Sequence, residues 1–541
     1  MTQKAFRPLQ NTITTAIRVM TLSVLGTVAF NAHADDITLT SSQLADANAL
    51  YATHCAACHN GDRLGGMGPA LLPESLGRLR GKKLVDVIAK GRAATQMPAF
   101  HESLSQAEMD LLATWLRQPL SETPSWDMPR IIDSHTVFVD PNGLPAQPQF
   151  DADPLNLFTV VEAGDHHVTV LDGDTFTPLD RFATPFALHG GAKYSPDGRF
   201  VYLASRDGWV QMYDLYSLQT VAEIRVGVNT RNVAVSDDGR YVMAGNMLPH
   251  TLVVLDARDL RPLMIIPVVG DHGKSSRVSA VYTAPPRQSF IVALKDLPEV
   301  WEISYAEEPR PVYPGFVHNY EANMVEALDV QYGPFPIRRI RLDDGLDDFF
   351  FDQDYRYLVG AARNGRDGQV VNLNVGHKIA EIALEGMPHL GSGITFEYQG
   401  RPVLATPHLK DPKISVIDME TWKTIKTIDT QGPGFFTRSH ENTPYAWVDV
   451  FFGPHKDVVH IFDKRTLEIV KTLRPEPGKV AAHVEFDRSG KHALLSIWDD
   501  DGAVIVYDAN TLKEVKRLPM KKPVGKYNVF NKITYSEGTS H

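Results

Sequence analysis

The feature that most constrains the fold of this chain is a short phrase that recurs through residues 153–541. In it, alternating apolar residues run into an acidic residue, as in VTVLD, VQMYD and VIVYD. The clear copies end at Asp172, Asp214, Asp256, Asp418, Asp463 and Asp508, spaced by 42 residues among the first three and by 45 among the last three. Looser copies at Glu302 and Asn374 bring the number of units to eight. A repeat of about 40 to 45 residues built from short strands is typical of a β-propeller, so the sequence predicts an all-β propeller of eight blades.

Two packed β-sandwiches are the competing all-β architecture. They predict neither a sustained period nor a last blade that closes on a strand from the start of the domain, a role for which LFTVVE at 157–162 is the candidate. The interval between Glu302 and Asn374 is longer than the others, which predicts an insertion of roughly 25 residues near 317–336.

Residues 35–122 have a helical character instead, with apolar residues at helical spacing in SQAEMDLLATWLRQ. They include the only two cysteines of the chain, Cys55 and Cys58, followed directly by His59. In the spacing C-x-x-C-H, two thiols form thioethers with a haem while the imidazole binds its iron. A zinc site needs further ligands, and a redox dithiol is expected in a βαβ setting. We therefore expect an all-α domain that resembles class I cytochrome c and carries one covalent haem c.

A low-spin haem of this type needs a second axial ligand. Met97, in the Met-Pro turn of AATQMPAFH, is our prediction, because thioether sulfur from a loop well after the attachment site is the usual solution in a small domain. Met67 and Met109 are the alternatives, although Met109 lies within an amphipathic helical pattern.

The first 34 residues have the pattern of a signal peptide, with basic residues, the apolar run VMTLSVLGTVAF and the cleavage signal Ala-His-Ala. That run is too short to span a bilayer, so no membrane span is expected in the mature chain. Cleavage shifts the formal charge from −11 to about −14, which makes nucleic acid an unlikely partner. We expect a periplasmic protein, because c-type haem attachment follows export. Residues 123–152 are predicted to link its two domains.

Propeller geometry predicts which side chains meet. Residues that enter the first strand of a blade and residues that leave the second lie at the same mouth of the channel, because successive strands reverse direction. The candidates are His189, Arg231, His389 and His483 at the first position and Arg206, His408 and Trp498 at the second. His250 and His455, in other loops, stay open as further candidates. Imidazoles and guanidinium groups together indicate a large anionic ligand that carries a metal.

With these residues in place, the chain resembles cytochrome cd1 nitrite reductase and its relatives in haem d1 biosynthesis over nearly its whole length. The motifs are FALHGGAKYSPDGRF, SRDGWVQMYDL, GVNTRNV, MPHLGSG and TPHLKDPKISVID. The resemblance implies a non-covalent haem d1 or dihydro-haem d1 in the propeller. It assigns His189 as the proximal iron ligand, Arg206 and Arg231 to the carboxylates, and His389 and His408 to the distal side.

Two departures from the reductase pattern favour the biosynthetic branch. His483 stands where the reductase is expected to have glutamine, and Tyr527 lies in a C-terminal phrase, VGKYNVFN, that differs from the reductase. That branch oxidises a propionate of the d1 precursor to an acrylate, a change that removes two electrons and two protons. A neutral imidazole suits the proton step, so His483 and Tyr527 are the predicted base and helper, with His389 a possible distal ligand.

The alternatives are a nitrite reductase that uses the same two haems and a non-enzymatic carrier of haem d1. The expected partners are the d1 precursor, a periplasmic cytochrome that accepts electrons and, transiently, a cytochrome cd1 nitrite reductase.

Overall fold

The structure, a computed structural model, describes residues 39–66, 68–77, 79, 81–92, 97–120, 122, 124–270, 272–313, 330–362 and 367–534. The expected signal peptide, the alternative ligand Met67 and residues 314–329 of the expected insertion lie outside the described residues. No described helix has the length and apolar character needed to cross a membrane.

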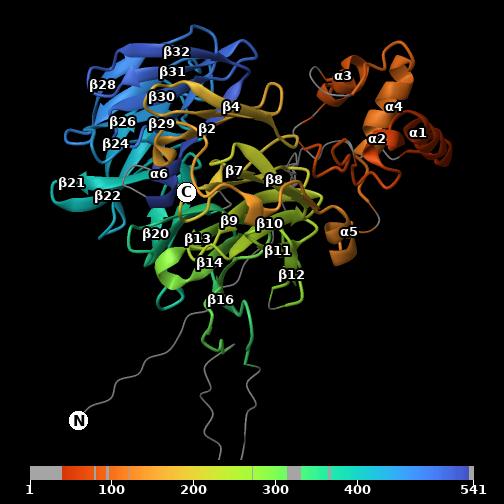
Figure 1. The fold of residues 1–541 in the computed structure, drawn as a ribbon, viewed down its shortest axis with the longest axis horizontal. Helices are drawn as coiled ribbons and strands as arrows, with labels where there is room; N and C mark the ends of the chain where they lie inside the picture. Colours follow the sequence, from red (N-terminus) through yellow and green to blue (C-terminus); the bar gives the residue numbers. More distant parts are fainter. Residues whose placement is uncertain are drawn as a thin grey trace, which may run out of the picture.

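The N-terminal lobe is helical, as predicted. Its helices are α1 (Ser41–His54), α2 (Ala56–His59), α3 (Lys83–Lys90) and α4 (Gln106–Leu116). Capping boxes start α1 at Thr40 and α4 at Ser105. In each, the side-chain oxygen of the cap accepts the backbone N–H of the residue three positions on, and the side chain of that residue accepts the backbone N–H of the cap. Helices α1 and α4 pack together, with the rings of Tyr51 and Trp115 5.1 Å apart. Figure 1 shows this lobe beside the larger β domain.

The segment predicted to be a linker is ordered. It forms α5 (Met128–Asp133), β1 (Thr136–Val137) and the 3-10 turn η1 (Pro141–Gly143), and a second such turn, η2 (Pro154–Asn156), follows it. Strand β1 pairs with β8 of the propeller, and Ile131 of α5 is fully buried in the same core cluster. The connection between the lobes therefore packs on the propeller as a fixed layer.

The described residues of the larger domain form eight antiparallel sheets, which confirms the predicted eight-bladed propeller (Figure 1). From the channel outward, the first four blades are β33 (Pro523–Asn528), β2 (Phe158–Glu162), β3 (His167–Leu171) and β4 (Pro178–Ala183); β5 (Lys193–Tyr194), β6 (Phe200–Ala204), β7 (Trp209–Asp214) and β8 (Gln219–Arg225); β9 (Asn229–Val235), β10 (Tyr241–Leu248), β11 (Thr251–Asp256) and β12 (Pro262–Pro267); and β13 (Val278–Ala284), β14 (Ser289–Leu294), β15 (Glu299–Ser304) and β16 (Ile337–Arg341).

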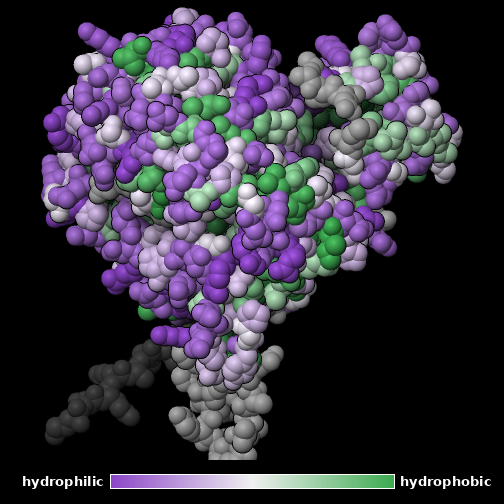
Figure 2. Space-filling model, in the orientation of Figure 1, coloured by the Kyte–Doolittle hydropathy of each residue, from purple (hydrophilic) through white to green (hydrophobic). Residues whose placement is uncertain are grey.

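The other four blades are β17 (Leu346–Phe351), β18 (Tyr357–Ala362), β19 (Asp367–Asn372) and β20 (His377–Ala383); β21 (Ile394–Tyr398), β22 (Arg401–Pro407), β23 (Lys413–Asp418) and β24 (Lys423–Asp429); β25 (Thr437–Arg438), β26 (Tyr445–Asp449), β27 (Val459–Asp463) and β28 (Glu468–Leu473); and β29 (Ala481–Phe486), β30 (His492–Ile497), β31 (Gly502–Asp508) and β32 (Glu514–Met520). Short 3-10 turns η3 (Pro285–Arg287) and η4 (Leu390–Ser392) precede β14 and β21. Figure 2 shows mostly hydrophilic residues over this domain, with hydrophobic ones in small scattered groups.

The recurrent acidic residue marks the end of the third strand of a blade. Asp418, for example, ends β23, and its carboxylate accepts the backbone N–H groups of Glu420 and Thr421 at 2.9 and 2.8 Å, which turns the chain into β24. In the two irregular blades the strand pairing places Ser304 and Asn372 at this position, two residues from the predicted anchors Glu302 and Asn374. The long connection of the fourth blade, residues 305–336, joins β15 to β16 where the insertion was expected.

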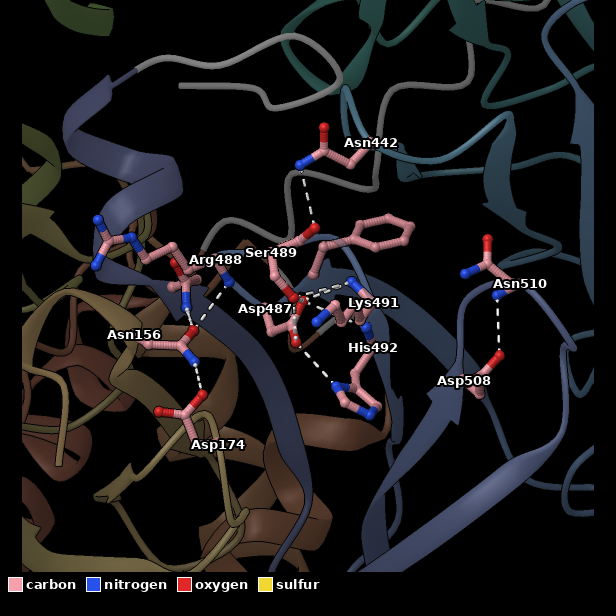
Figure 3. A network of polar contacts seen from close by, with 12 residues as sticks. Asn156, Asp174, Asn442, Asp487, Arg488, Ser489, Lys491, His492, Asp508 and Asn510 are labelled. Carbon is pink, nitrogen blue, oxygen red and sulfur yellow. Dashed lines mark hydrogen bonds and ion pairs between the residues drawn. The ribbon is translucent and has the colours of Figure 1, made fainter.

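The propeller closes as predicted, because N-terminal strand β2 pairs with C-terminal strand β33, which completes that blade on the channel side. A polar network around Asn156 supports the closure (Figure 3). The side-chain oxygen of Asn156 accepts the backbone N–H of Arg488 at 2.9 Å, and its amide donates to Asp174 at 2.9 Å. Helix α6 (Val529–Thr534) follows β33 directly and packs on η2 and β5.

Candidate functional site

The haem-attachment motif lies where α1 passes into α2. The N–H of His59 donates to the carbonyl of Cys55 at 3.0 Å, so the two cysteines and the histidine share one turn. His59 is 7% exposed, and its Nδ1 lies 2.7 Å from the carbonyl oxygen of Pro69, which leaves Nε2 as the nitrogen for a metal. A Cβ at Gly68 would lie 2.6 Å from the His59 ring, so the backbone can approach the imidazole this closely only because residue 68 is glycine. These residues fit a covalent haem.

Met97 stands at the start of its turn, against the end of α3. Its carbonyl accepts the N–H of Arg92 at 3.2 Å and lies 2.6 Å from where a Cβ of Gly91 would be, and Gly91 has a φ of 68°. The alternative Met109 is 4% exposed and packs in the helical core with Leu112. The core position of Met109 favours Met97, whose role as the ligand stays a prediction.

The helical lobe contacts the propeller through the loop that follows the haem-attachment helix. The guanidinium of Arg225, at the end of β8, donates to the carbonyls of Leu64 and Gly65 at 2.6 and 3.2 Å. It lies 4.5 Å from the ring centroid of Trp126, whose indole N–H donates to the carbonyl of Arg225 at 2.9 Å. On the other side of the helical lobe, the guanidinium of Arg92 lies 5.5 Å over the ring of Phe186. Both loops of the expected haem c pocket thus contact the propeller.

At the mouth of the channel the structure brings His189 together with both predicted arginines. Nδ1 of His189 lies 2.8 Å from the carbonyl of Arg231, and Arg206 donates to Nε2 at 2.8 Å. A guanidinium nitrogen of Arg231 lies 3.1 Å from each ring nitrogen. Gly190 and Gly191 follow with φ of 89° and 74°, a backbone that glycine adopts freely. Both ring nitrogens of His189 are engaged here, so the binding of iron at Nε2 would require the Arg206 guanidinium to move away from it, where it could pair with a carboxylate of the macrocycle.

His389 and His408 lie close together, since the N–H of His389 donates to the carbonyl of Pro407, but their rings have different surroundings. Nδ1 of His389 lies 2.7 Å from the carbonyl of Phe435, and the two rings are 4.2 Å apart. Burial lowers the pKa of His389 below its ordinary value, which favours the neutral imidazole. His408 is fully buried, with one ring nitrogen bonded to the carbonyl of Glu385 and the other 2.9 Å from the hydroxyl of Ser415. Both nitrogens of His408 are engaged, so its predicted contact with a ligand finds no support in this geometry.

His483 and Tyr527 meet at the same mouth. Their rings are 5.4 Å apart and nearly perpendicular, and the Phe436 ring contacts His483 at 4.8 Å. The Tyr527 ring also borders Gly191, since a Cβ there would lie 3.1 Å from it, so the pair adjoins the His189 loop. Phe436 also packs near the indole of Trp498, with ring centroids 6.2 Å apart.

The surroundings of the His483 side chain favour its neutral, unprotonated form. The residue is 2% exposed, and no group in the described part of the chain hydrogen-bonds to its Nδ1. Burial, together with the charges of Lys526, Arg438 and Lys532, holds the pKa of His483 well below its ordinary value of 6.5. Burial raises the pKa of Tyr527 to about 12, so both groups are uncharged near neutral pH.

Sequence reasoning missed the buried charges behind these rings. Arg438 and Lys526 are 4% and 0% exposed, and Asp449 and Glu485 are each 1% exposed. Lys526 was visible in the phrase GKYNVFN, whereas Asp449 and Arg438 carry no sequence pattern that separates them from strand ends elsewhere. Nitrogen atoms of His483, Trp498 and Arg438 are buried without a hydrogen-bond partner among the described residues, which fits a mouth that receives a polar, anionic macrocycle.

Comparisons with known proteins agree with this geometry. The family model described as "Cytochrome D1 heme domain" matches residues 152–322 and 314–532, and that of "Cytochrome C oxidase, cbb3-type, subunit III" matches residues 42–116. The chain is 55% identical over 497 residues to the dihydro-heme d1 dehydrogenase of Pseudomonas aeruginosa, covering 92% of this chain and 96% of the relative. It is 26% identical to the nitrite reductase of Stutzerimonas stutzeri, covering 94% and 96% of the two chains.

Among solved structures, the chain is similar to "Dihydro-heme d1 dehydrogenase NirN in complex with DHE" with a TM-score of 0.84 and 54% identity. That match covers 90% of this chain and all of the other.

Proposed function

This chain belongs to the cytochrome D1 heme domain family, and we propose that it oxidises a propionate side chain of dihydro-haem d1 to an acrylate. The relative at 55% identity bears the name of that dehydrogenase, and the matching structure holds DHE. The nitrite reductase, at 26% identity, is a more distant relative over a similar length.

In the proposed reaction, one C–H bond breaks at each of the two propionate carbons, and a C=C bond forms between them. Two protons and two electrons leave the substrate. Nδ1 of His483 takes the first proton, and Tyr527, whose ring contacts the His483 ring, helps to orient the propionate side chain of the substrate. The second proton passes to solvent. A covalent haem c on Cys55 and Cys58 would supply the one-electron redox chemistry that the two electrons need on their way to an external acceptor.

The substrate is held by groups at the mouth. His189 would hold the iron of the substrate, His389 is the candidate for a second iron ligand, and Arg206 and Arg231 would pair with carboxylates. Trp498, whose indole lies near Phe436, would border the macrocycle. Cys55 and Cys58 hold haem c, with His59 and Met97 as its iron ligands.

The setting of the reaction is also part of the proposal. We assign the mature protein to the periplasm, since the N-terminal pattern indicates export and the C-x-x-C-H motif requires it. The electron acceptor is a periplasmic cytochrome, and the product passes to a cytochrome cd1 nitrite reductase in a transient contact.

The observation that carries the dehydrogenase proposal is the buried imidazole of His483 beside Tyr527 and the His189 loop, with an Nδ1 to which none of the described residues hydrogen-bonds. A nitrite reductase would instead use two distal histidines as proton donors, and here His408 is fully buried with its two nitrogens bonded to Glu385, in the connection before its blade, and to Ser415, within it.

The test compares wild type with His483→Gln. Purified protein with oxidised haem c is mixed with dihydro-haem d1, and the spectra of both haems are followed, with nitrite turnover measured in parallel. Wild type should convert the precursor, and the variant should bind it while turnover falls by about 10² to 10⁴, the usual worth of a positioned base. Nitrite turnover without conversion would make the protein a reductase, and binding with no redox change would make it a carrier.

A further inference from the structure

His483 occupies an irregular position in its strand. Pairing between β29 and β30 runs from Ala482 opposite Ser496 to Val484 opposite Leu495, so His483 has no partner residue across the ladder. Its φ is 56°, in the left-handed region that residues with a side chain rarely adopt. The residue therefore forms a bulge that turns its side chain away from the normal alternation of the strand.

A bulge leaves the backbone groups of the extra residue outside the ladder, and buried groups of that kind need other partners. Here both partners are charged side chains. The N–H of His483 donates to Oδ2 of Asp449 at 3.2 Å, and its carbonyl accepts a hydrogen bond from Nζ of Lys526. Asp449 ends β26 in the blade on one side, and Lys526 lies in β33 of the blade on the other. His483 is thus bound between the two neighbouring blades.

The same two side chains also order the groups around the imidazole. Oδ1 of Asp449 accepts the N–H groups of Phe435 and Phe436 at 2.7 and 3.1 Å. Phe435 packs on His389, and Phe436 packs on His483. Lys526 also donates to the hydroxyl of Ser496 at 2.9 Å and directly precedes Tyr527. The Asp449 carboxylate therefore positions the two phenylalanines whose rings pack on His389 and His483.

Holding charged groups in this position is costly. Burial raises the pKa of Asp449 to about 6 and lowers that of Lys526 to about 7, so both groups lose part of their preference for the charged state. Two apolar side chains would suit the joint between blades better if packing were the only requirement.

We propose that Asp449 and Lys526 are positioning residues, which fix the backbone of His483 in the left-handed bulge so that its imidazole faces the propionate of the bound substrate. This inference rests on the proposed function. The two residues do not touch the substrate, and they act through the orientation of His483. A misplacement of a catalytic group by about 1 Å costs about 10² in rate, which sets the size of the expected effect.

The central variant is Lys526→Met, which keeps the length of the side chain and removes the hydrogen-bond donor. Lys532→Met is the matched control. Lys532 is also buried, and its charge also lowers the pKa of His483. Its described contact is with the Tyr527 ring and not with the backbone of His483. We expect kcat to fall about 10²-fold in Lys526→Met with KM and the spectrum of bound precursor unchanged, and less than about 10-fold in Lys532→Met. On the other side of the bulge, Asp449→Asn leaves one acceptor oxygen for the three N–H groups that the carboxylate binds, so it should also lower kcat. Asp449→Ala, which removes both oxygens, should lower kcat further.

A double-mutant cycle separates positioning from a general loss of structure. In the His483→Gln background, Lys526→Met should cause little further loss, because the residue through which it acts is already gone. A loss as large as in the wild-type background would overturn the proposal, and so would a higher KM or failure to bind the precursor.

A crystal structure of Lys526→Met gives a readout that does not depend on turnover. The proposal expects His483 to leave the left-handed region, and an unchanged φ would refute it. If wild type itself fails to convert the precursor, the proposed function is wrong, and this structure still decides whether Lys526 positions His483.

Discussion

Replacing Arg225 by methionine should uncouple the helical lobe from the propeller. Arg225 is 3% exposed and makes the charged hydrogen bonds between the two lobes, to the carbonyls of Leu64 and Gly65. These carbonyls belong to the loop that follows the haem-attachment helix. The substitution removes the donors while retaining a side chain of similar length against Trp126.

The expected magnitude follows from these contacts. A hydrogen bond to a charged group contributes about 1.5 to 3 kcal/mol, so the two bonds across the interface contribute about 3 to 6 kcal/mol before the cost of burying the cation. That cost is real here, because burial lowers the pKa of Arg225. A net loss of about 3 kcal/mol is therefore expected, which is about 10² in the equilibrium between docked and undocked lobes.

Two measurements test this prediction. Calorimetry of the holoprotein should show one transition in wild type and two separate transitions in Arg225→Met. In stopped flow with dihydro-haem d1, reduction of haem c should slow by about 10-fold or more while precursor binding is unchanged. Arg258→Met is the control, since Arg258 is 77% exposed and pairs with Asp256 within one blade. A single transition and an unchanged reduction rate would refute the reasoning and leave the other contacts between the lobes, such as the apolar cluster of Leu64 and Leu72 with Val228 and Leu248, to hold them together.

Three further predictions concern single side chains. Met97→Ala should abolish the sulfur-to-iron charge-transfer band of oxidised haem c, and Met109→Leu should leave it intact; the opposite pattern in absorption spectra would make Met109 the ligand. His189→Ala should lose or greatly weaken binding of haem d1 in spectroscopic titrations while the haem c content stays the same, and undiminished binding would move the iron to another histidine. Burial lowers the pKa of His408 to about 4, so the unfolded chain takes up a proton there as the pH falls from 6.5 to about 4, and stability is lost in that window. In urea titrations, His408→Gln should lose less stability between these pH values than wild type, and an equal loss would contradict the burial effect.

The propeller was predictable because the anchoring acid has a structural task that repeats. Each copy ends a third strand and binds the backbone of the next turn, as Asp214 does for Tyr216 and Ser217 at 3.2 and 3.3 Å. The prediction was less accurate in the two blades where Ser304 and Asn372 take that position, because serine and asparagine in a strand end do not stand out from the surrounding polar residues. The packed linker was not predictable, since its pairing with β8 depends on a strand far along the chain.

The candidate site was predictable only where a side chain acts at a strand end that topology places at the mouth. His189 met this condition, whereas Arg231 and His483, which were predicted at the same point of entry, are the third residues of β9 and β29; the structure brings all three into one region. Asp449 and Lys526 did not meet the condition. They bond to the backbone of His483, and because every residue type has the same backbone groups, no sequence pattern indicates such a contact. His408 met the topological condition, yet its ring lies against Glu385 and Ser415, since position in a strand does not determine the direction of a side chain.

This division has a physical origin in the propeller itself. Residues within the inner strands of the blades are fixed by packing between blades, and many of them are apolar and buried, whereas outermost strands such as β24 and β28 are largely exposed. A strand end contributes little to that packing, so histidine, arginine or tryptophan can stand there without loss of stability, and side chains from several blades converge at the mouth. Arg231 and His483 are exceptions, because they lie inside β9 and β29, each where the strand pairing is irregular. A polar residue there needs a bulge to reach the mouth, and the bulge at His483 needs buried partners from both adjacent blades. The two buried charges that hold His483 are therefore expected wherever the family keeps a base at this position, and a relative with glutamine there has less need of them.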